Sequence, residues 1–273
     1  RFKKSINKDK TETMNKLVAY KMDGLGNDFI IFDQRKKSVS LTKEQIIKIS
    51  DRSNIGCDQV IFIENDKNSD VFLKFYNSDG GEISACGNGT RCVAYLLMKE
   101  NKSNQMSLKT KAGIIYAKLN DNNLVCLNMG QPNFEWNKIP LIKKMDNKNL
   151  KIKINNNDGK EFIGGFTLNV GNPHIVFFVD DFNKFDLKEI GPKIENHKFF
   201  PEKCNVTLAS IKNKKHIKVK VWERGAGLTK ACGTAACATA VSGAVLGLSE
   251  RSTDIEFSEG LLNINWKLDN HIY

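Results

Sequence analysis

The feature that most constrains the fold of this chain is an internal repeat. Ala85-Cys86-Gly87-Asn88-Gly89 recurs as Ala231-Cys232-Gly233-Thr234-Ala235, 146 residues later. Each copy follows a strand-like run and opens a segment that is apolar on most sides, which is typical of a buried helix. The repeat therefore predicts two similar α/β halves, each with a curved sheet wrapped on a central helix.

The length of 273 residues leaves room for two domains of ordinary size. We expect a polar tail over residues 1–13, an N-terminal half over residues 14–132 and a C-terminal half over residues 133–273. Residues 131–160 are rich in Pro, Asn and Lys and have the composition of a linker.

Composition excludes several classes of protein. Hydrophobic residues make up 40% and charged residues 27%, so the chain can bury a core and is not disordered throughout. No apolar run approaches the length of a membrane span. The net charge of +11 comes mainly from lysines scattered singly and in pairs, with six arginines in all. A nucleic-acid surface would favour clustered arginine with interleaved aromatic residues, so no nucleic-acid role is expected.

The number and spacing of the seven cysteines are not those of a disulfide framework or a metal site. They are Cys57, Cys86, Cys92, Cys126, Cys204, Cys232 and Cys237. A secreted framework is usually even-numbered and denser, and residues 1–20 lack the apolar segment of a signal peptide. No pair has the CxxC spacing of a zinc site. We expect reduced thiols, a cytoplasmic protein and no metal.

A cysteine at a helix start can perform proton chemistry. The unpaired N–H groups there carry a partial positive charge that favours thiolate. The same amides, at Gly87, Asn88, Gly233 and Thr234, can hold a carboxylate. Two such cysteines, one in each half, would act on one bound molecule from opposite faces. Each cysteine taken alone is more often a small buried hydrophobe, and that interpretation is kept for the other five.

Seven motifs in order carry a resemblance to a known family. They are Met22-Asp-Gly-Leu-Gly-Asn-Asp-Phe29, Asn77-Ser-Asp-Gly, Cys86-Gly-Asn-Gly-Thr-Arg-Cys92, Gly171-Asn-Pro-His174, Asn205-Val, Glu223-Arg-Gly225 and Ala231-Cys-Gly-Thr234. From about Lys16 to its end, the chain resembles the diaminopimelate epimerase family. The resemblance implies an α/β (α+β) fold of two pseudo-symmetric halves, each a mostly antiparallel half-barrel. It also suggests that a final strand of the family is missing after Tyr273.

The resemblance further implies an activity, which is the cofactor-independent epimerisation of LL- to meso-2,6-diaminopimelate on the route to lysine and peptidoglycan. Cys86 and Cys232 would be the acid/base pair, and His174 and Glu223 would tune their pKa values, in an order that stays open. Residues that would bind the substrate are Asn27, Gln59, Asn77, Gly87, Asn88, Asn172, Asn205, Glu223, Arg224, Gly233 and Thr234. A related racemase or epimerase of histidine or lysine is the alternative. The expected partner is the small-molecule substrate, without membrane or cofactor, and whether the protein forms a homodimer stays open.

Overall fold

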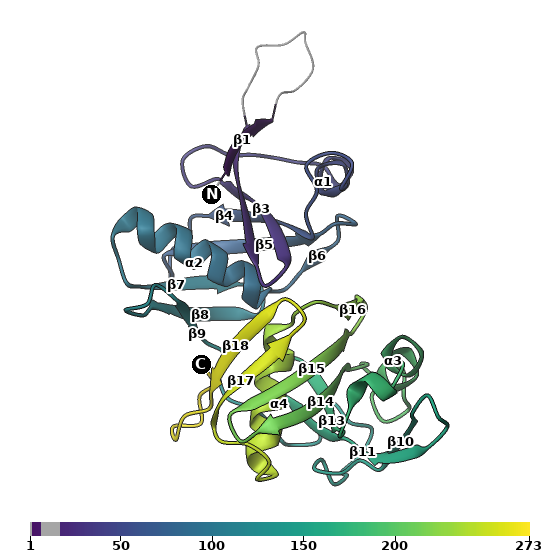
Figure 1. Ribbon diagram of the computed structural model, residues 1–273. Helices are drawn as coiled ribbons and strands as arrows, with labels where there is room; N and C mark the ends of the chain where they lie inside the picture. Colours follow the sequence, from purple (N-terminus) through teal and green to yellow (C-terminus); the bar gives the residue numbers. More distant parts are fainter. Residues whose placement is uncertain (1, 7–16) are drawn as a thin grey trace. The chain divides into compact units, whose positions relative to one another are not determined.

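The computed structural model describes residues 2–6 and 17–273, and the chain divides into two compact units. The N-terminal unit spans Arg1–Leu127 and the C-terminal unit spans Asn128–Tyr273 (Figure 1). The boundary lies five residues before the expected division at 132/133.

The N-terminal unit is a curled sheet around one helix. The nine-stranded sheet has the order β1-β2-β3-β4-β5-β7-β8-β9, with β6 paired to β5. The strands are β1 (Phe2–Ile6), β2 (Leu17–Gly24), β3 (Asn27–Asp33), β4 (Gln59–Glu64), β5 (Val71–Asn77), β6 (Glu82–Ile83), β7 (Gln105–Thr110), β8 (Gly113–Leu119) and β9 (Val125–Asn128). The central helix α2 (Gly87–Asn101) packs against β2 and β3 and also against β7 and β8. Because these pairs lie toward opposite edges of the sheet, the sheet must curve around the helix.

The C-terminal unit repeats this plan. Its seven-stranded sheet has the order β12-β13-β14-β15-β17-β18, with β16 paired to β15. The strands are β12 (Phe166–Asn169), β13 (Pro173–Phe178), β14 (Asn205–Asn213), β15 (His216–Glu223), β16 (Gly227–Thr229), β17 (Ser252–Phe257) and β18 (Gly260–Asn265). The central helix α4 (Gly233–Val245) packs against β12, β13, β14, β17 and β18. A separate hairpin joins β10 (Ile152–Asn155) to β11 (Glu161–Gly164).

Strand pairing shows the duplication directly. From β2 to β8 the successive pairs are antiparallel, parallel, antiparallel, parallel and antiparallel. From β12 to β18 the same sequence of orientations recurs. The predicted α/β fold of two similar, sheet-dominated halves is confirmed.

A second helix covers the outer face of each sheet. Helix α1 (Lys43–Ser50) begins with the capping box of Thr42 and Gln45, and its Ile46 packs on Ile30 and Phe32. In the C-terminal unit, α3 (Leu187–Glu195) packs on β14, β15 and β16, and a short 3-10 helix, η1 (Phe182–Lys184), precedes it. With helices on both faces, the central strands are buried on both sides, which accounts for their nearly continuous apolar sequences.

Two expectations from the sequence differ from the structure. Within the expected tail, residues 2–6 form β1 and pair with β2, whereas residues 1 and 7–13 lie outside the described residues. Backbone pairing along a strand edge needs no apolar pattern, so composition gave no signal of it. The expected linker contributes Ile139, Leu141 and Leu150 to the core of the C-terminal unit. The few apolar residues of this segment are separated by Lys and Asn, so its mean hydropathy is low and does not indicate a buried region.

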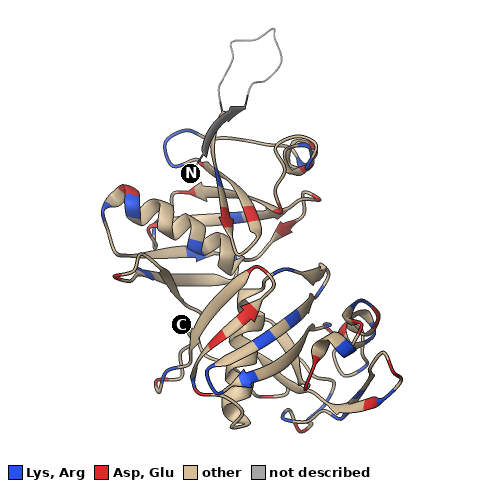
Figure 2. Ribbon diagram, in the orientation of Figure 1, with Lys and Arg blue, Asp and Glu red and all other residues tan. Residues whose placement is uncertain are grey.

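Charged groups are dispersed over both units. Figure 2 shows Lys and Arg on helices, strands and loops, interspersed with Asp and Glu. None of the helices in the described ranges has the length and apolar character needed to cross a membrane.

Candidate active site

Both repeated cysteines are the N-cap residues of the central helices. Cys86 precedes α2 with φ −143° and ψ 115°, and Cys232 precedes α4 with φ −141° and ψ 116°. The Cys86 carbonyl accepts the Thr90 amide at 2.8 Å, and the Cys232 carbonyl accepts the Ala236 amide at 3.0 Å. The preceding amides of each first turn have no intrahelical acceptor and give that end a partial positive charge. Each unit therefore presents the same cysteine, amide and dipole arrangement.

In the N-terminal unit, Cys86 is half-buried and faces an amide. Its Sγ donates to Asn27 Oδ1 at 3.8 Å, and Asn27 Nδ2 donates to Asp58 Oδ2 at 3.1 Å. Asn27 opens β3 after a two-residue turn in which Leu25 (φ 61°) and Gly26 (φ 72°) both have positive φ. Two positive φ values are the signature of a type I′ hairpin turn. This tight turn fixes where Asn27 begins the strand.

Three further predicted residues lie on or beside the same sheet and helix. Gln59 and Asn77 pair across β4 and β5, and Gln59 Nε2 donates to Asn77 Oδ1 at 3.0 Å. Within the described ranges, Gln59 Oε1 is buried without a hydrogen-bond partner. A buried acceptor without a partner costs free energy, so this oxygen is suited to a ligand N–H. Asn88 is buried, and its Oδ1 accepts from Arg91 Nη2 at 2.6 Å.

In the C-terminal unit, Cys232 is buried and faces a carboxyl group. Its Sγ lies 3.3 Å from Thr234 Oγ1 and forms a hydrogen bond with the Glu223 side chain. Burial, reinforced by the negative charge of Glu223, raises the pKa of the Cys232 thiol well above its usual value. Burial also raises the pKa of Glu223, against the hydrogen bond that Thr229 Oγ1 donates to Glu223 Oε1 at 2.6 Å. Cys232 is thus a protonated thiol in the unliganded protein.

His174 is fully buried in β13, where it pairs with Asn205 of β14. Its Nε2 lies 2.8 Å from Asn172 Oδ1, which can only accept, so Nε2 carries the proton. Burial, with a smaller contribution from the charge of Arg224, lowers the pKa of His174 to about 3. The ring is therefore neutral near pH 7, and within the described residues its Nδ1 has no partner.

Asn205 and Arg224 are held together at the end of this sheet. Asn205 Oδ1 accepts the Arg224 amide at 2.9 Å, and Asn205 Nδ2 donates to the Pro173 carbonyl at 3.0 Å. The Arg224 side chain is exposed, and its Nη1 donates to the Glu202 carbonyl at 2.9 Å. The guanidinium accordingly extends over the surface of the unit rather than into its core.

The sequence did not predict Glu195 and Asp58, two carboxylates that hold segments of the candidate site in place. Glu195 Oε2 accepts from Trp222 Nε1 at 2.7 Å, and Glu195 Oε1 accepts from the Gly225 amide at 3.1 Å. These contacts bracket Glu223 and Arg224. Asp58 plays the corresponding part beside Asn27. Neither carboxylate stands at a position that spacing or composition distinguishes from an ordinary charged residue.

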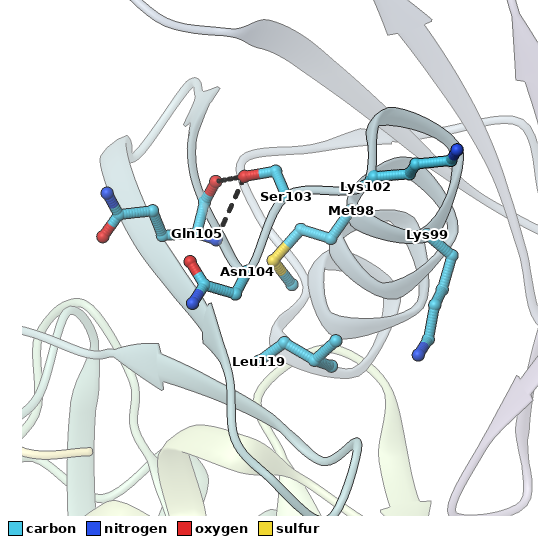
Figure 3. A pocket seen from close by; sticks show the side chains of 7 residues that line it. All are labelled: Met98, Lys99, Lys102, Ser103, Asn104, Gln105 and Leu119. Carbon is cyan, nitrogen blue, oxygen red and sulfur yellow. Dashed lines mark hydrogen bonds between the residues drawn. The ribbon is translucent and has the colours of Figure 1, made fainter.

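A surface pocket of about 590 Å³ lies at the opposite end of α2 from Cys86. Its lining includes Met98, Leu119 and the two lysines Lys99 and Lys102. Figure 3 shows the two ammonium groups pointing away from one another, while Ser103 and Gln105 are hydrogen-bonded together. The pocket therefore lacks converging charges, and it is separate from the residues gathered around the cysteine.

The remaining chemistry-bearing residues of the described ranges do not form another centre. No group of three or more His, Cys, Asp or Glu that could hold a metal ion occurs there. Cys57, Cys92 and Cys204 are buried, and burial raises their pKa values, for Cys92 to about 12.

Comparisons with known proteins show the family and the fold of this chain. The family profile described as diaminopimelate epimerase matches residues 19–135 and 166–273. The chain is 58% identical to a diaminopimelate epimerase of Pelagibacter ubique, over 94% of each chain. It is 42% identical to one of Phenylobacterium zucineum, over 92% of this chain and 91% of the other. A solved structure of a predicted epimerase from Pseudomonas aeruginosa, 13% identical, has a TM-score of 0.62 over 93% of each chain and shares the fold.

Proposed function

Since the chain belongs to the diaminopimelate epimerase family, as its seven motifs predicted, we propose that it interconverts LL- and meso-2,6-diaminopimelate with Cys86 and Cys232 as an acid/base pair. The proposal depends chiefly on one observation, the nearly identical backbone geometry of the two cysteines at the starts of α2 and α4. A duplicated cysteine at a duplicated helix start suits a reaction that treats two faces of one carbon alike.

The chemistry requires a proton to leave one face of the α-carbon and another to arrive at the opposite face. A thiolate and a thiol perform both transfers and exchange roles with the direction of reaction. The raised pKa of Cys232, caused first by burial and then by Glu223, makes it the proton donor in the unliganded protein. Cys86 then takes the first proton. Because side chains of the protein supply both groups, the mechanism needs no cofactor.

Negative charge that develops on the substrate carboxylate needs stabilisation as the proton leaves. The amides of Gly87 and Asn88, and those of Gly233 and Thr234, belong to the first turns of the central helices. Fixed N–H donors and the helix dipole are most effective where charge develops in the transition state. We assign these four residues to the carboxylate of the reacting centre.

The remaining polar residues are assigned to recognition of the substrate. Gln59 Oε1, which has no partner among the described residues, suits the distal ammonium group, and the exposed Arg224 guanidinium suits the distal carboxylate. Asn27, Asn77, Asn172 and Asn205 supply further amide groups. The neutral His174 and the carboxyl group of Glu223 are assigned to tuning the cysteines, with Glu223 acting on Cys232.

The location and partners follow from the proposed reaction. We assign the protein to the cytoplasm, where a biosynthetic enzyme with reduced thiols operates, with the small-molecule substrate as its partner. Association into a homodimer is tested by light scattering of the purified protein.

Solvent isotope exchange tests the function. With LL-diaminopimelate in deuterium oxide, deuterium should enter the α-position of the product as meso-diaminopimelate accumulates. Histidine and lysine, each as a single enantiomer, should exchange far more slowly under the same conditions. Faster exchange of either amino acid would identify the protein as a racemase on the same scaffold.

A further inference from the structure

The side-chain amide of Asn27 lies between two groups of opposite hydrogen-bonding character. Its Nδ2 is 3.1 Å from Asp58 Oδ2, and its Oδ1 is 3.8 Å from Cys86 Sγ. An amide has one donor end and one acceptor end, so whichever group fixes one end also decides what the other end offers.

Asp58 can fix only one of the two orientations. A carboxylate oxygen accepts hydrogen bonds and donates none, so the end of Asn27 that faces it must be the NH₂ group. The carbonyl end is then turned toward the cysteine. There it accepts from the S–H group and offers nothing to a thiolate, which stabilises the protonated sulfur.

Asp58 is itself held rigidly. Its Oδ2 also accepts the Asp28 amide at 3.0 Å, and its Oδ1 accepts from Arg52 Nη2 at 2.7 Å. Arg52 makes two further contacts to the Asp28 carboxylate, at 2.7 and 2.8 Å. The Asp58 amide donates back to Asp28 Oδ1 at 2.9 Å. These reciprocal contacts join the start of β3 to the residue before β4, so the carboxylate has little freedom to turn away from Asn27.

We propose that Asp58 is a positioning residue for Cys86, because it orients the Asn27 amide so that its oxygen meets the sulfur. The inference rests on the proposed function in one respect only, which is that Cys86 is the group that exchanges protons with substrate. Asp58 then keeps Cys86 from being trapped as a hydrogen-bonded thiolate, which would be a weaker base.

Other charged groups contribute to the surroundings of this network. Lys21 forms an ion pair with Asp28 at 2.7 Å, and its ammonium group also contacts the Gly56 carbonyl. Arg91 of α2 and Asp23 of β2 both influence the pKa of Cys92, after burial. A change of charge at Asp58 therefore acts on the sulfur in two ways, through space and through Asn27, and the experiment must separate them.

The test compares Asp58→Asn in two backgrounds. Alkylation of Cys86 by iodoacetamide is followed against pH in the unliganded protein, and the Cys86 peptide is quantified by mass spectrometry. The amide of Asp58→Asn can donate, so Asn27 becomes free to turn its own NH₂ group toward the thiolate. The midpoint of Cys86 alkylation should fall by about one pH unit, the scale of one hydrogen bond. In the Asn27→Ala background the same substitution should shift it by less than about a third of that.

Two further variants complete the experiment. Asp58→Ser removes the carboxylate oxygen that accepts from Asn27 Nδ2, and it should reproduce the shift if Asp58→Asn folds poorly. Asp70→Asn removes a carboxylate that joins β5 to β7 through Ser107 and should leave Cys86 unchanged. Equal shifts in both backgrounds, or no shift in either, would overturn the proposal. Because no substrate is present, that outcome is distinct from a failure of the epimerase assay.

Discussion

The two cysteines share one backbone geometry but have chemically different neighbours. Cys86 faces the neutral amide of Asn27, whereas Cys232 faces the carboxyl group of Glu223. A carboxylate beside a thiol disfavours thiolate, and a neutral amide has no such charge effect. The duplicated elements thus place the two cysteines equivalently, and the different neighbouring residues give the two thiols different tendencies to lose a proton.

Replacement of the cysteines should separate proton transfer from packing. Cys86→Ala and Cys232→Ala should each abolish epimerisation, because either change removes the group that serves one face of the carbon. Cys92→Ala and Cys237→Ala should retain activity and lose about 1–3 kcal/mol of stability, since both side chains are buried inside the central helices. Deuterium exchange and urea unfolding measure the two effects. Near-normal turnover in Cys86→Ala or Cys232→Ala would exclude the two-base mechanism.

Glu223→Gln tests the asymmetry between the cysteines. The carboxyl group of Glu223 raises the pKa of Cys232, second to burial, so its removal should lower that pKa and shift Cys232 alkylation to lower pH. Glu256→Gln is the matched control, because Glu256 contacts His216 and Lys218 rather than Cys232. Equal pH profiles for Cys232 in wild type and Glu223→Gln would assign its raised pKa to burial alone.

Among the elements, α2 depends on a glycine where α4 has an alanine. A Cβ on Gly89 would lie 2.7 Å from Ile61 Cδ1 and 3.0 Å from Phe75 Cε1, both fully buried. Gly89→Ala should therefore destabilise the N-terminal unit by about 1–3 kcal/mol through overpacking, partly offset by about 1 kcal/mol of helix propensity. Hydrogen exchange of α2 amides measures the loss. Asn101→Ala, at the exposed end of the same helix, should not be destabilising, and a stable Gly89→Ala would show that the sheet yields locally.

The elements differ in how far the sequence predicts them. The Ala-Cys-Gly repeat and the apolar runs after it predict both central helices and the two halves. They do not predict that residues 2–6 pair with β2, or that Ile139 and Leu150 enter the core. The site shows the same division. Asn27, Asn77 and Glu223 stand in recognisable motifs, whereas Asp58 and Glu195 act through contacts between segments distant in sequence.

Across the whole molecule, the repeated order of parallel and antiparallel strand pairs allows the two units to be compared position by position. Phe29 and Gln59 begin the parallel pair of β3 and β4, as His174 and Asn205 begin that of β13 and β14. The first unit thus has an apolar ring where the second has an imidazole, although both are buried completely. At this position the C-terminal unit therefore has a buried group that can bind a proton, and the N-terminal unit does not.

His174 should therefore make the stability of the C-terminal unit dependent on pH. Its pKa is lowered to about 3 in the folded protein, mainly by burial, from the model-peptide value of about 6.5. Between these values the unfolded chain binds a proton that the folded chain excludes, so stability falls as pH drops below about 6.5. From pH 7 to pH 5 the loss due to His174 should be about 2 kcal/mol. His174→Phe, which copies Phe29, should lack this component.

Trp136, Trp222 and Trp266 all lie in the C-terminal unit, so tryptophan fluorescence during urea unfolding reports on the stability of that unit. Val176→Ala removes buried volume from the same strand without a titratable group, and it should lower stability at both pH values while keeping the wild-type pH dependence. An unchanged pH dependence in His174→Phe would mean that the imidazole is protonated in the folded protein or gains a partner on acidification.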